Sequence, residues 1–306
     1  MVRYQHWLFF ELKVKIMEND IKPAKTGLVL EGGGMRGLYT AGVLDILMRE
    51  NIWPDGVIGV SAGAIHGCSY LSEQYGRSAR YNVKYINDKR YMSMNSLIKT
   101  GDIFNVDFCY GTIPNELAVF DYNKFASNAE KIPFYVVCSN VETGKPEYIR
   151  CRDFRSEMDY MRASASLPLV SRIVEVDGKK LLDGGTTDSI PVAYFQKLGY
   201  DKNIVLLTRP KGYQKKPDAT IRVIEKVYRD YPEYVEACRN RYIMYNQTLK
   251  YIEHYEKEGK ILVLRPSREF KISRMEKNVK KLKYLYKMGR YDTIKRLDEI
   301  KAFIAK

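Results

Sequence analysis

The stretch "VIGVSAGAIHG", residues 57–67, sets the expected fold of the chain around one serine. An apolar run, a tight glycine turn and a run of small residues predict a strand, a sharp turn and a helix. Ser61 stands at the tip of the turn, between Gly59 and Gly63. Such a strand-turn-helix elbow exposes a serine hydroxyl at a sheet edge, which a nucleophile requires. A glycine turn whose serine only caps the helix is the alternative.

A serine nucleophile needs a base, and the three histidines of the chain are poor candidates. His66 lies about 7 Å along the helix that starts beside Ser61, at ~1.5 Å per residue, so its side chain cannot reach back to the serine. We expect it to be a polar residue satisfied within helix packing. His6 lies in the doubtful N-terminal leader, and His254 lies in a charged run typical of a surface helix.

Asp183 is the alternative base. It ends the apolar run "LLD" and is followed by Gly184 and Gly185, which allow close approach of another loop. A carboxylate with a pKa near 4 is a weak base in water, but partial desolvation raises that pKa. A bonded hydroxyl can then pass its proton to the carboxylate as it attacks an ester. A plain Asp-Gly turn is the competing interpretation.

The stretch "GGGMRG", residues 32–37, offers backbone N–H groups just ahead of a predicted helix. Gly33 and Gly34 are the expected oxyanion hole, and Arg36 is expected to anchor the loop or an anionic headgroup. The glycine spacing also matches a dinucleotide fingerprint. That motif requires an acidic residue at the end of the second strand, and this chain has Ser61 there. The nucleotide-binding interpretation is therefore disfavoured.

The alternation of apolar strands with helices predicts an α/β fold around a mainly parallel sheet. The strands are expected within 26–34, 56–63, 134–149, 179–185, 203–208 and 260–267. The main helices are expected within 35–50, 156–167, 191–199, 223–259 and 274–304. Residues 75–130 show no clear periodicity. Ligands of such sheets bind beyond the carboxyl ends of the strands, so the glycine turns should meet at one edge.

Composition limits the class of protein and its organisation. The chain of 306 residues is 45% hydrophobic and 29% charged, as in a folded globular protein. Its five cysteines form no C-x-x-C pair, which fits reduced thiols in the cytoplasm. We expect a doubtful leader at 1–22, of which residues 1–16 fall outside the fold. A catalytic domain at 23–210 and a basic, mainly helical region at 211–306 packed on it follow.

Positive charge is concentrated in the last third of the chain. Residues 210–306 hold 25 Lys and Arg against 13 Asp and Glu, which accounts for +12 of the net charge of +14. This asymmetry indicates either solvated faces of long helices or an acidic partner. We expect peripheral contact between residues 211–306 and an anionic membrane surface, and no nucleic-acid partner.

With these pieces in order, the chain resembles a bacterial member of the patatin-like phospholipase family. The resemblance rests on GGGMRG at 32–37, GVSAG at 59–63, ASASLP at 163–168 and DGG at 183–185. It implies a three-layer α/β/α fold, a Ser61–Asp183 dyad, an oxyanion hole in the 32–37 loop and hydrolysis of lipid acyl esters without a metal or cofactor. Glu31 departs from the aspartate that many members have before the glycines. By analogy, ASASLP packs a helix end near the site.

The sequence therefore predicts a phospholipase A or lysophospholipase that forms an acyl-Ser61 intermediate. The alternatives are a Rossmann-like nucleotide-binding protein and a non-catalytic lipid-binding module. The residues leave the choice between phospholipid, lysophospholipid and neutral lipid open. Beside Ser61, Asp183, Gly33 and Gly34, the expected supporting residues are Gly32, Met35, Arg36, Gly37, Gly59, Gly63, Gly184 and Gly185.

Overall fold

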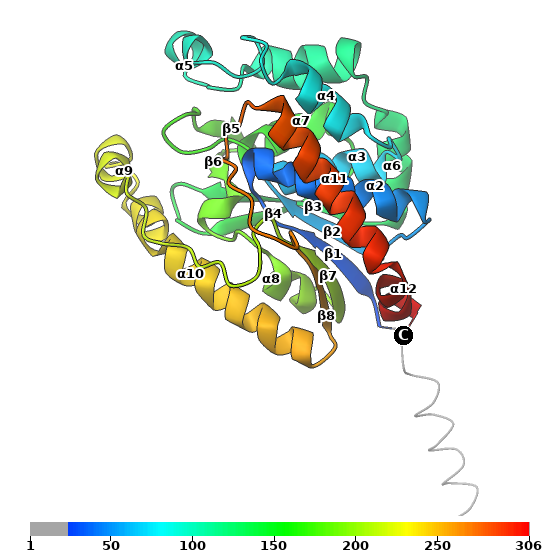
Figure 1. The fold of residues 1–306 in the computed structure, drawn as a ribbon. Coiled ribbons are helices and arrows are strands. Elements are labelled where there is room, and N and C mark those ends of the chain that lie inside the picture. Colours follow the sequence, from blue (N-terminus) through cyan, green and yellow to red (C-terminus); the bar gives the residue numbers. More distant parts are fainter. Residues whose placement is uncertain (1–23, 306) are drawn as a thin grey trace, which may run out of the picture.

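The computed structural model describes residues 24–305, which form a central sheet enclosed by helices (Figure 1). Five strands run parallel, in the spatial order β3 (Phe134–Asn140), β2 (Gly56–Val60), β1 (Thr26–Leu30), β7 (Lys202–Leu206) and β8 (Ile261–Leu264). Three further strands are antiparallel to their neighbours: β4 (Pro146–Cys151) and β6 (Lys179–Asp183) pair with β3, and β5 (Val174–Val176) pairs with β6.

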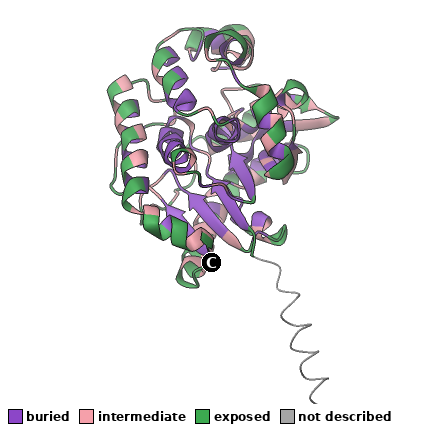
Figure 2. Ribbon diagram, turned by 90° about the vertical axis from the view of Figure 1, so that its right-hand side faces the viewer, coloured by how far each residue is buried: buried purple, intermediate pink, exposed green. Residues whose placement is uncertain are grey.

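The sheet is buried on both faces, as the continuous apolar strands predict. Within β1, Leu28 and Leu30 enter one hydrophobic core and Val29 enters the other, because successive side chains point to opposite faces. Figure 2 shows the strands buried and the outer sides of the helices exposed. One face carries α2 (Leu38–Arg49), α3 (Ala62–Leu71), α7 (Phe154–Ser164) and α11 (Val279–Lys295), and the other carries α8 (Val192–Lys197) and α10 (Pro232–Lys257). The three-layer α/β/α expectation is confirmed.

Residues 75–130 are helical, although their sequence shows no clear period. They form α4 (Arg77–Tyr85), α5 (Met94–Thr100), the π-helical segment η2 (Asp107–Leu117) and α6 (Tyr122–Lys131). The π-helix changes the side-chain spacing and contains Pro114, which hides the usual pattern. Side-chain caps at Ser93 and Asp121 mark the starts of α5 and α6 and were readable from the sequence.

Strands β2 and β6 meet end to end along one edge of β3. Val137 pairs with Val60 of β2 and also with β4, while Cys138 pairs with Asp183 of β6 and also with β4. Since β4 occupies one edge of β3 at both positions, β2 and β6 share the other edge. Strand β6 is thus an antiparallel member of the mainly parallel sheet that the sequence predicts. Asp183 reaches the carboxyl end of β2 because β6 approaches it from the opposite direction.

The basic C-terminal region completes the fold with α9 (Ile221–Val227), α10, β8, α11 and α12 (Leu297–Ala305). Strand β8 extends the parallel sheet next to β7, and α11 lies along α2 (Figure 1). The two helices approach through glycines: a Cβ added at Gly289 would overlap the carbonyl oxygen of Tyr39, and one added at Gly42 would overlap that of Tyr286. None of the described helices is long and apolar enough to cross a bilayer.

We expect Gly289→Val to destabilise the protein by about 1–3 kcal/mol, because the new side chain forces α11 away from α2. Chemical denaturation measures the free energy of unfolding. Gly111→Val is the matched control, since a Cβ at Gly111 would meet no atom within 4 Å, and its effect should stay within about 0.5 kcal/mol. Equal losses in both variants would contradict close packing at Gly289.

Candidate active site

Ser61 sits at a strained turn between β2 and α3. Its backbone has φ 54° and ψ −124°, a conformation that costs a non-glycine residue about 1–3 kcal/mol. The flanking glycines allow this turn, because a Cβ at Gly59 would lie 2.6 Å from the backbone of Ala64 and one at Gly63 would overlap the carbonyl oxygen of Leu30. The Ser61 side chain makes no capping hydrogen bond to α3. Its hydroxyl is therefore not used as a helix cap.

The ASASLP stretch holds the backbone on both sides of the site. The Ser164 hydroxyl accepts a hydrogen bond from Ser61 N–H at 2.9 Å and donates one to the Val137 carbonyl at 2.6 Å. Two residues later, the carbonyl of Ser166 accepts a hydrogen bond from Asp183 N–H at 2.8 Å. The sequence analysis expected only a helix end here and missed both serines as positioning residues. Their signal was a run of small polar residues between a helix and a proline.

Asp183 is buried at the end of β6, with 3% of its surface exposed. Its Oδ1 accepts a hydrogen bond from Gly185 N–H at 2.7 Å. Its Oδ2 is buried and has no hydrogen-bond partner among the described residues. Burial raises the pKa of Asp183, and the adjacent Ser61 side chain and Arg241 oppose that rise. The Ser61 side chain thus lies close enough to the Asp183 carboxylate to lower its pKa, but forms no hydrogen bond of standard geometry with Oδ2.

The glycine loop follows β1 and leads into η1 (Gly34–Gly37). Gly34 has φ +56°, and a Cβ on Gly32 would lie 3.2 Å from the Cβ of Ser61. The N–H groups of Gly33 and Gly34 donate to no described residue, whereas Met35 N–H donates to the Arg274 carbonyl at 2.9 Å. The loop thus keeps two free donors beside Ser61 and is held from outside by the C-terminal region.

Glu31 connects the loop to two other elements, a role that the sequence analysis did not assign. Its buried carboxylate accepts hydrogen bonds from the Thr208 N–H at 2.5 Å, the Thr208 hydroxyl at 3.0 Å and the Tyr245 hydroxyl at 2.6 Å. Burial and the Glu31 charge raise the pKa of Tyr245, so the phenol stays a donor. The carboxylate therefore links the ends of β1 and β7 to helix α10, where Tyr245 lies.

His66 and His254 lie where they were expected, with one correction. His66 is 3% exposed, and burial lowers its pKa to about 4, so it is neutral at pH 7. Its Nδ1 has no partner among the described residues, so the expectation of a satisfied polar residue is wrong for that atom. His254 lies on the surface of α10 and pairs with Glu258 at 3.0 Å. His6 lies outside the described residues.

Two cavities meet at Ser61. Gly34, Ser61, Leu167 and Arg274 line both of them. The first cavity is mainly apolar and is enclosed by α3, α4, η2 and α7, with Tyr81, Phe104, Ile113, Phe154, Met158 and Met161 among its walls. The second is polar and brings together all three glycine turns, with walls that include Gly33, Glu31, Arg36, Asp183, Gly185 and Arg241. Ser61 thus faces an apolar space on one side and a charged one on the other.

Among residues 24–305, no three His, Cys, Asp or Glu side chains gather closely enough to hold a metal ion. The groups that face Ser61 are instead a carboxylate, backbone amides and basic side chains. Such a set can accept a proton and stabilise negative charge on a carbonyl oxygen.

Two family models match parts of the chain. Residues 28–195 match the family model "Patatin-like phospholipase", and residues 231–305 match a domain of unknown function, DUF6363. The uncharacterized protein YjjU of Escherichia coli is 28% identical over 62% of this chain and 53% of its own length. The lysophospholipase nte1 of Aspergillus fumigatus is 30% identical over 57% of this chain and 11% of its own.

The chain thus spans about half the length of YjjU and a small part of the fungal enzyme. A crystal structure of VipD from Legionella pneumophila shares 12% identity at a TM-score of 0.43 over 90% of this chain and 67% of that one, which is too distant to support an argument. The family model, in contrast, covers more than half of the chain. The protein therefore belongs to the patatin-like phospholipase family.

Proposed function

We propose that the protein is a serine lipid acyl hydrolase of the phospholipase A or lysophospholipase type, working through Ser61 and Asp183. One observation carries the proposal: a strained, uncapped serine lies beside a buried carboxylate oxygen without a partner, where an apolar and a polar cavity meet. The nte1 relative is named a lysophospholipase, which agrees with this class of substrate.

In the proposed reaction, Ser61 Oγ attacks the ester carbonyl while its proton moves to Asp183 Oδ2. The N–H groups of Gly33 and Gly34 stabilise the negative charge on the carbonyl oxygen. The tetrahedral intermediate expels the alcohol, which takes the proton back from Asp183, and the acyl group stays on Ser61. A water then gives a proton to Asp183 and attacks the acyl-serine. The fatty acid leaves as Ser61 recovers its proton.

The burial of Asp183 supports its role as base. A raised carboxyl pKa brings the proton affinity of Asp183 closer to that of the hydroxyl that it must deprotonate. The hydrogen bond from Gly185 holds Oδ1 and leaves Oδ2 for the proton. His66 does not compete for this role, because its lowered pKa makes it a weaker base and it lies beyond the first turn of α3.

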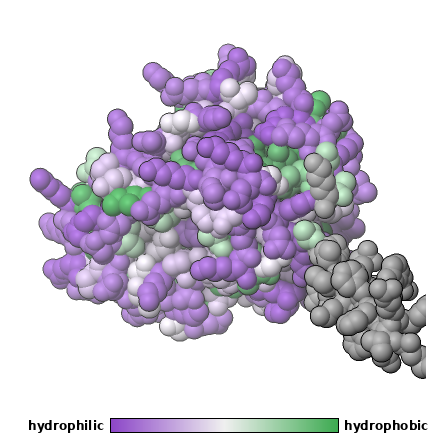
Figure 3. Space-filling view, turned by 90° about the horizontal axis from the view of Figure 1, so that it is seen from below, coloured by the Kyte–Doolittle hydropathy of each residue, from purple (hydrophilic) through white to green (hydrophobic). Residues whose placement is uncertain are grey.

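We also propose that the C-terminal region contacts an anionic membrane surface through α9. Val223 and Val227 are 52% and 56% exposed on this helix, and the basic residues Arg222 and Lys226 precede each of them. The underside of the molecule in Figure 3 is mostly hydrophilic, with small separate hydrophobic areas. An exposed apolar pair next to basic side chains is suited to the boundary between headgroups and acyl chains.

We expect a fluorophosphonate probe to label the wild-type protein at one serine, Ser61. Ser61→Ala removes the nucleophile and should abolish labelling. Asp183→Asn removes the base and should slow labelling at least about 100-fold, in the range typical of general-base catalysis. Gel fluorescence over time and peptide mapping give the rate and the site.

His66→Ala is the matched control for that experiment, because it also alters a buried titratable residue near Ser61. A folded His66→Ala protein should keep labelling within a few fold of wild type. Loss of labelling in this variant, with a wild-type circular dichroism spectrum, would contradict the dyad. An unlabelled wild-type protein would favour a non-catalytic lipid-binding module.

We expect the protein to sediment with vesicles that contain phosphatidylglycerol and not with pure phosphatidylcholine vesicles. Binding should weaken as salt is raised from low to high concentration, because screening shortens the range of the attraction. Val223→Asp/Val227→Asp should reduce binding about tenfold or more, whereas Leu198→Asp, at an exposed apolar site at the end of α8, should not. Binding that ignores both lipid charge and salt would rule out an electrostatic contact.

A further inference from the structure

Five basic side chains surround the polar cavity beside Ser61. Their guanidinium and ammonium groups come from the glycine loop, the segment after β7, helix α10 and the segment before α11: Arg36, Arg209, Lys215, Arg241 and Arg274. The acidic residues on the same walls are Glu31 and Asp183. Glu31 already accepts three hydrogen bonds from Thr208 and Tyr245. The cavity therefore has a clear excess of positive charge.

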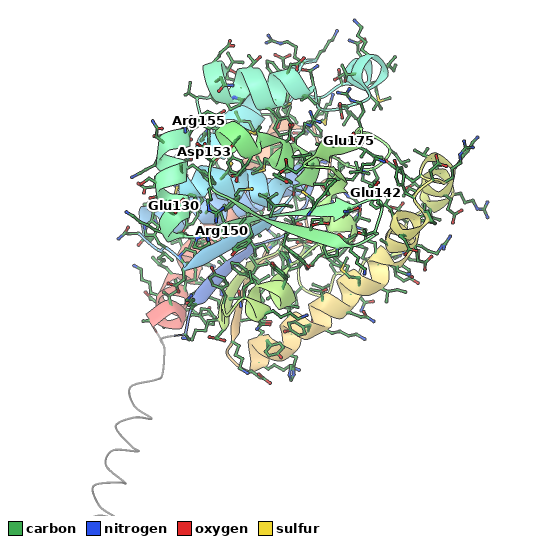
Figure 4. The ribbon with its side chains drawn as sticks, turned by 180° about the vertical axis from the view of Figure 1, so that it is seen from behind. Glu130, Glu142, Arg150, Asp153, Arg155 and Glu175 are labelled. Carbon is green, nitrogen blue, oxygen red and sulfur yellow. The ribbon has the colours of Figure 1, made fainter. Side chains whose placement is uncertain are left out.

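These five side chains have no anionic partner within the described chain. None of them forms an ion pair within 4 Å or donates a side-chain hydrogen bond to a residue of 24–305. On the rear face of the molecule, in contrast, Arg155 pairs with Asp153 at 3.2 Å (Figure 4). Some basic side chains at the surface therefore form ion pairs, whereas none of the five beside Ser61 does.

Arg36 is the most buried of these five side chains. It is only 7% exposed, and its Nε is buried without a partner, as is Nε of Arg241. A buried, unpaired charge is unfavourable, and a bound anion is one of the partners that can satisfy such a group. Both Arg36 and Arg241 line the polar cavity beside Ser61.

Burial and neighbouring positive charges together lower the pKa of two of these side chains. Burial, Arg241 and Arg274 lower the pKa of Lys215 to about 7, although Glu31 acts in the opposite direction. Burial and Arg209 lower the pKa of Arg36 to about 10. A bound anion would reverse these effects and restore the full charge of Lys215.

We propose that this cluster is a subsite for the phosphate group of a phospholipid or lysophospholipid substrate. The proposal rests on the function proposed for Ser61. A lipid that lies across Ser61 places its acyl chain in the apolar cavity, its ester carbonyl at the glycine loop and its phosphate among the basic side chains. In glycerophospholipids the phosphate lies a few bonds from the ester, which fits two cavities that share Ser61 as a wall.

The C-terminal region, residues 211–306, supplies three of the five cations in this subsite: Lys215, Arg241 and Arg274. Arg241 lies on α10 and Arg274 lies between β8 and α11, both within the match to the domain of unknown function. The carbonyl of Arg274 also accepts the hydrogen bond from Met35 N–H, which fixes this segment against the glycine loop. We infer that the region's role at the active site is to recognise the headgroup phosphate.

The test compares two soluble esters with the same short acyl chain, a lysophosphatidylcholine and a monoacylglycerol, both below their micelle concentrations. We expect wild-type kcat/KM to favour the phosphate-bearing ester. In Arg241→Gln/Arg274→Gln the ratio of the two kcat/KM values should fall about 10- to 100-fold, because hydrogen bonds to charged groups are lost for one substrate only. The loss should appear mainly in KM.

Arg152→Gln/Lys89→Gln is the matched control. It also removes two positive charges, but at exposed positions that line neither cavity. The ratio of the two kcat/KM values should therefore stay at the wild-type value. The thermal midpoint of Arg241→Gln/Arg274→Gln should equal or exceed that of wild type, because repulsion within the cluster is relieved. These two measurements separate lost recognition from lost folding or from a general charge effect.

Equal losses on both esters, or no loss on either, would overturn the subsite. A free phosphate ion is the other source of this chemistry. If millimolar inorganic phosphate inhibits monoacylglycerol hydrolysis in wild type and not in the double variant, while the two esters react equally, the cluster binds free phosphate and the headgroup assignment fails. Fluorophosphonate labelling of Ser61 is followed in parallel. If Ser61 is not labelled, the proposed function is contradicted. If Ser61 is labelled but the enzyme does not discriminate between the two esters, only the subsite is contradicted.

Discussion

The hydroxyl of Ser164 occupies the position on which the rest of the site depends. It accepts a hydrogen bond from the backbone of Ser61 and donates one to the carbonyl of Val137, so it ties the turn after β2 to β3. Ser61 has a left-handed backbone that an L residue adopts only at a cost. A buried hydrogen bond at its own N–H offsets part of that cost and leaves the Ser61 hydroxyl free. The same short stretch then holds Asp183 through the carbonyl of Ser166.

The sheet turns this local constraint into an active-site geometry. Strands β2 and β6 run toward each other along one edge of β3, so Ser61 and Asp183 face each other at the point where the two strands end. On one side of this point the helices of residues 75–130 and α7 enclose an apolar cavity. On the other side the C-terminal region closes a basic one. A substrate with an apolar chain and an anionic headgroup matches that division.

Local patterns in the sequence predict the turns of the site, whereas long-range packing decides which of its elements meet. The turns at Ser61 and at GGGMRG could be predicted from their glycines, because tight turns and close backbone approach require small residues. The direction of β6 relative to its neighbours could not be predicted, because a short apolar run is compatible with either a parallel or an antiparallel strand. The contacts of Glu31 with Tyr245 and of Ser164 with Ser61 join residues more than a hundred positions apart, and no local pattern announces them. The helices of 75–130 were missed because a proline-containing π-helix lies among them.

The most direct test of the account is to trap the acyl group on the enzyme. Wild-type protein is mixed with an activated fatty acyl ester, quenched in acid within the first turnover and analysed by intact mass and peptide mapping. The account predicts one acyl group per protein, attached to Ser61, and almost none in Asp183→Asn under the same conditions. Hydrolysis by the wild type with no acyl-serine, or with the acyl group on another residue, would contradict it.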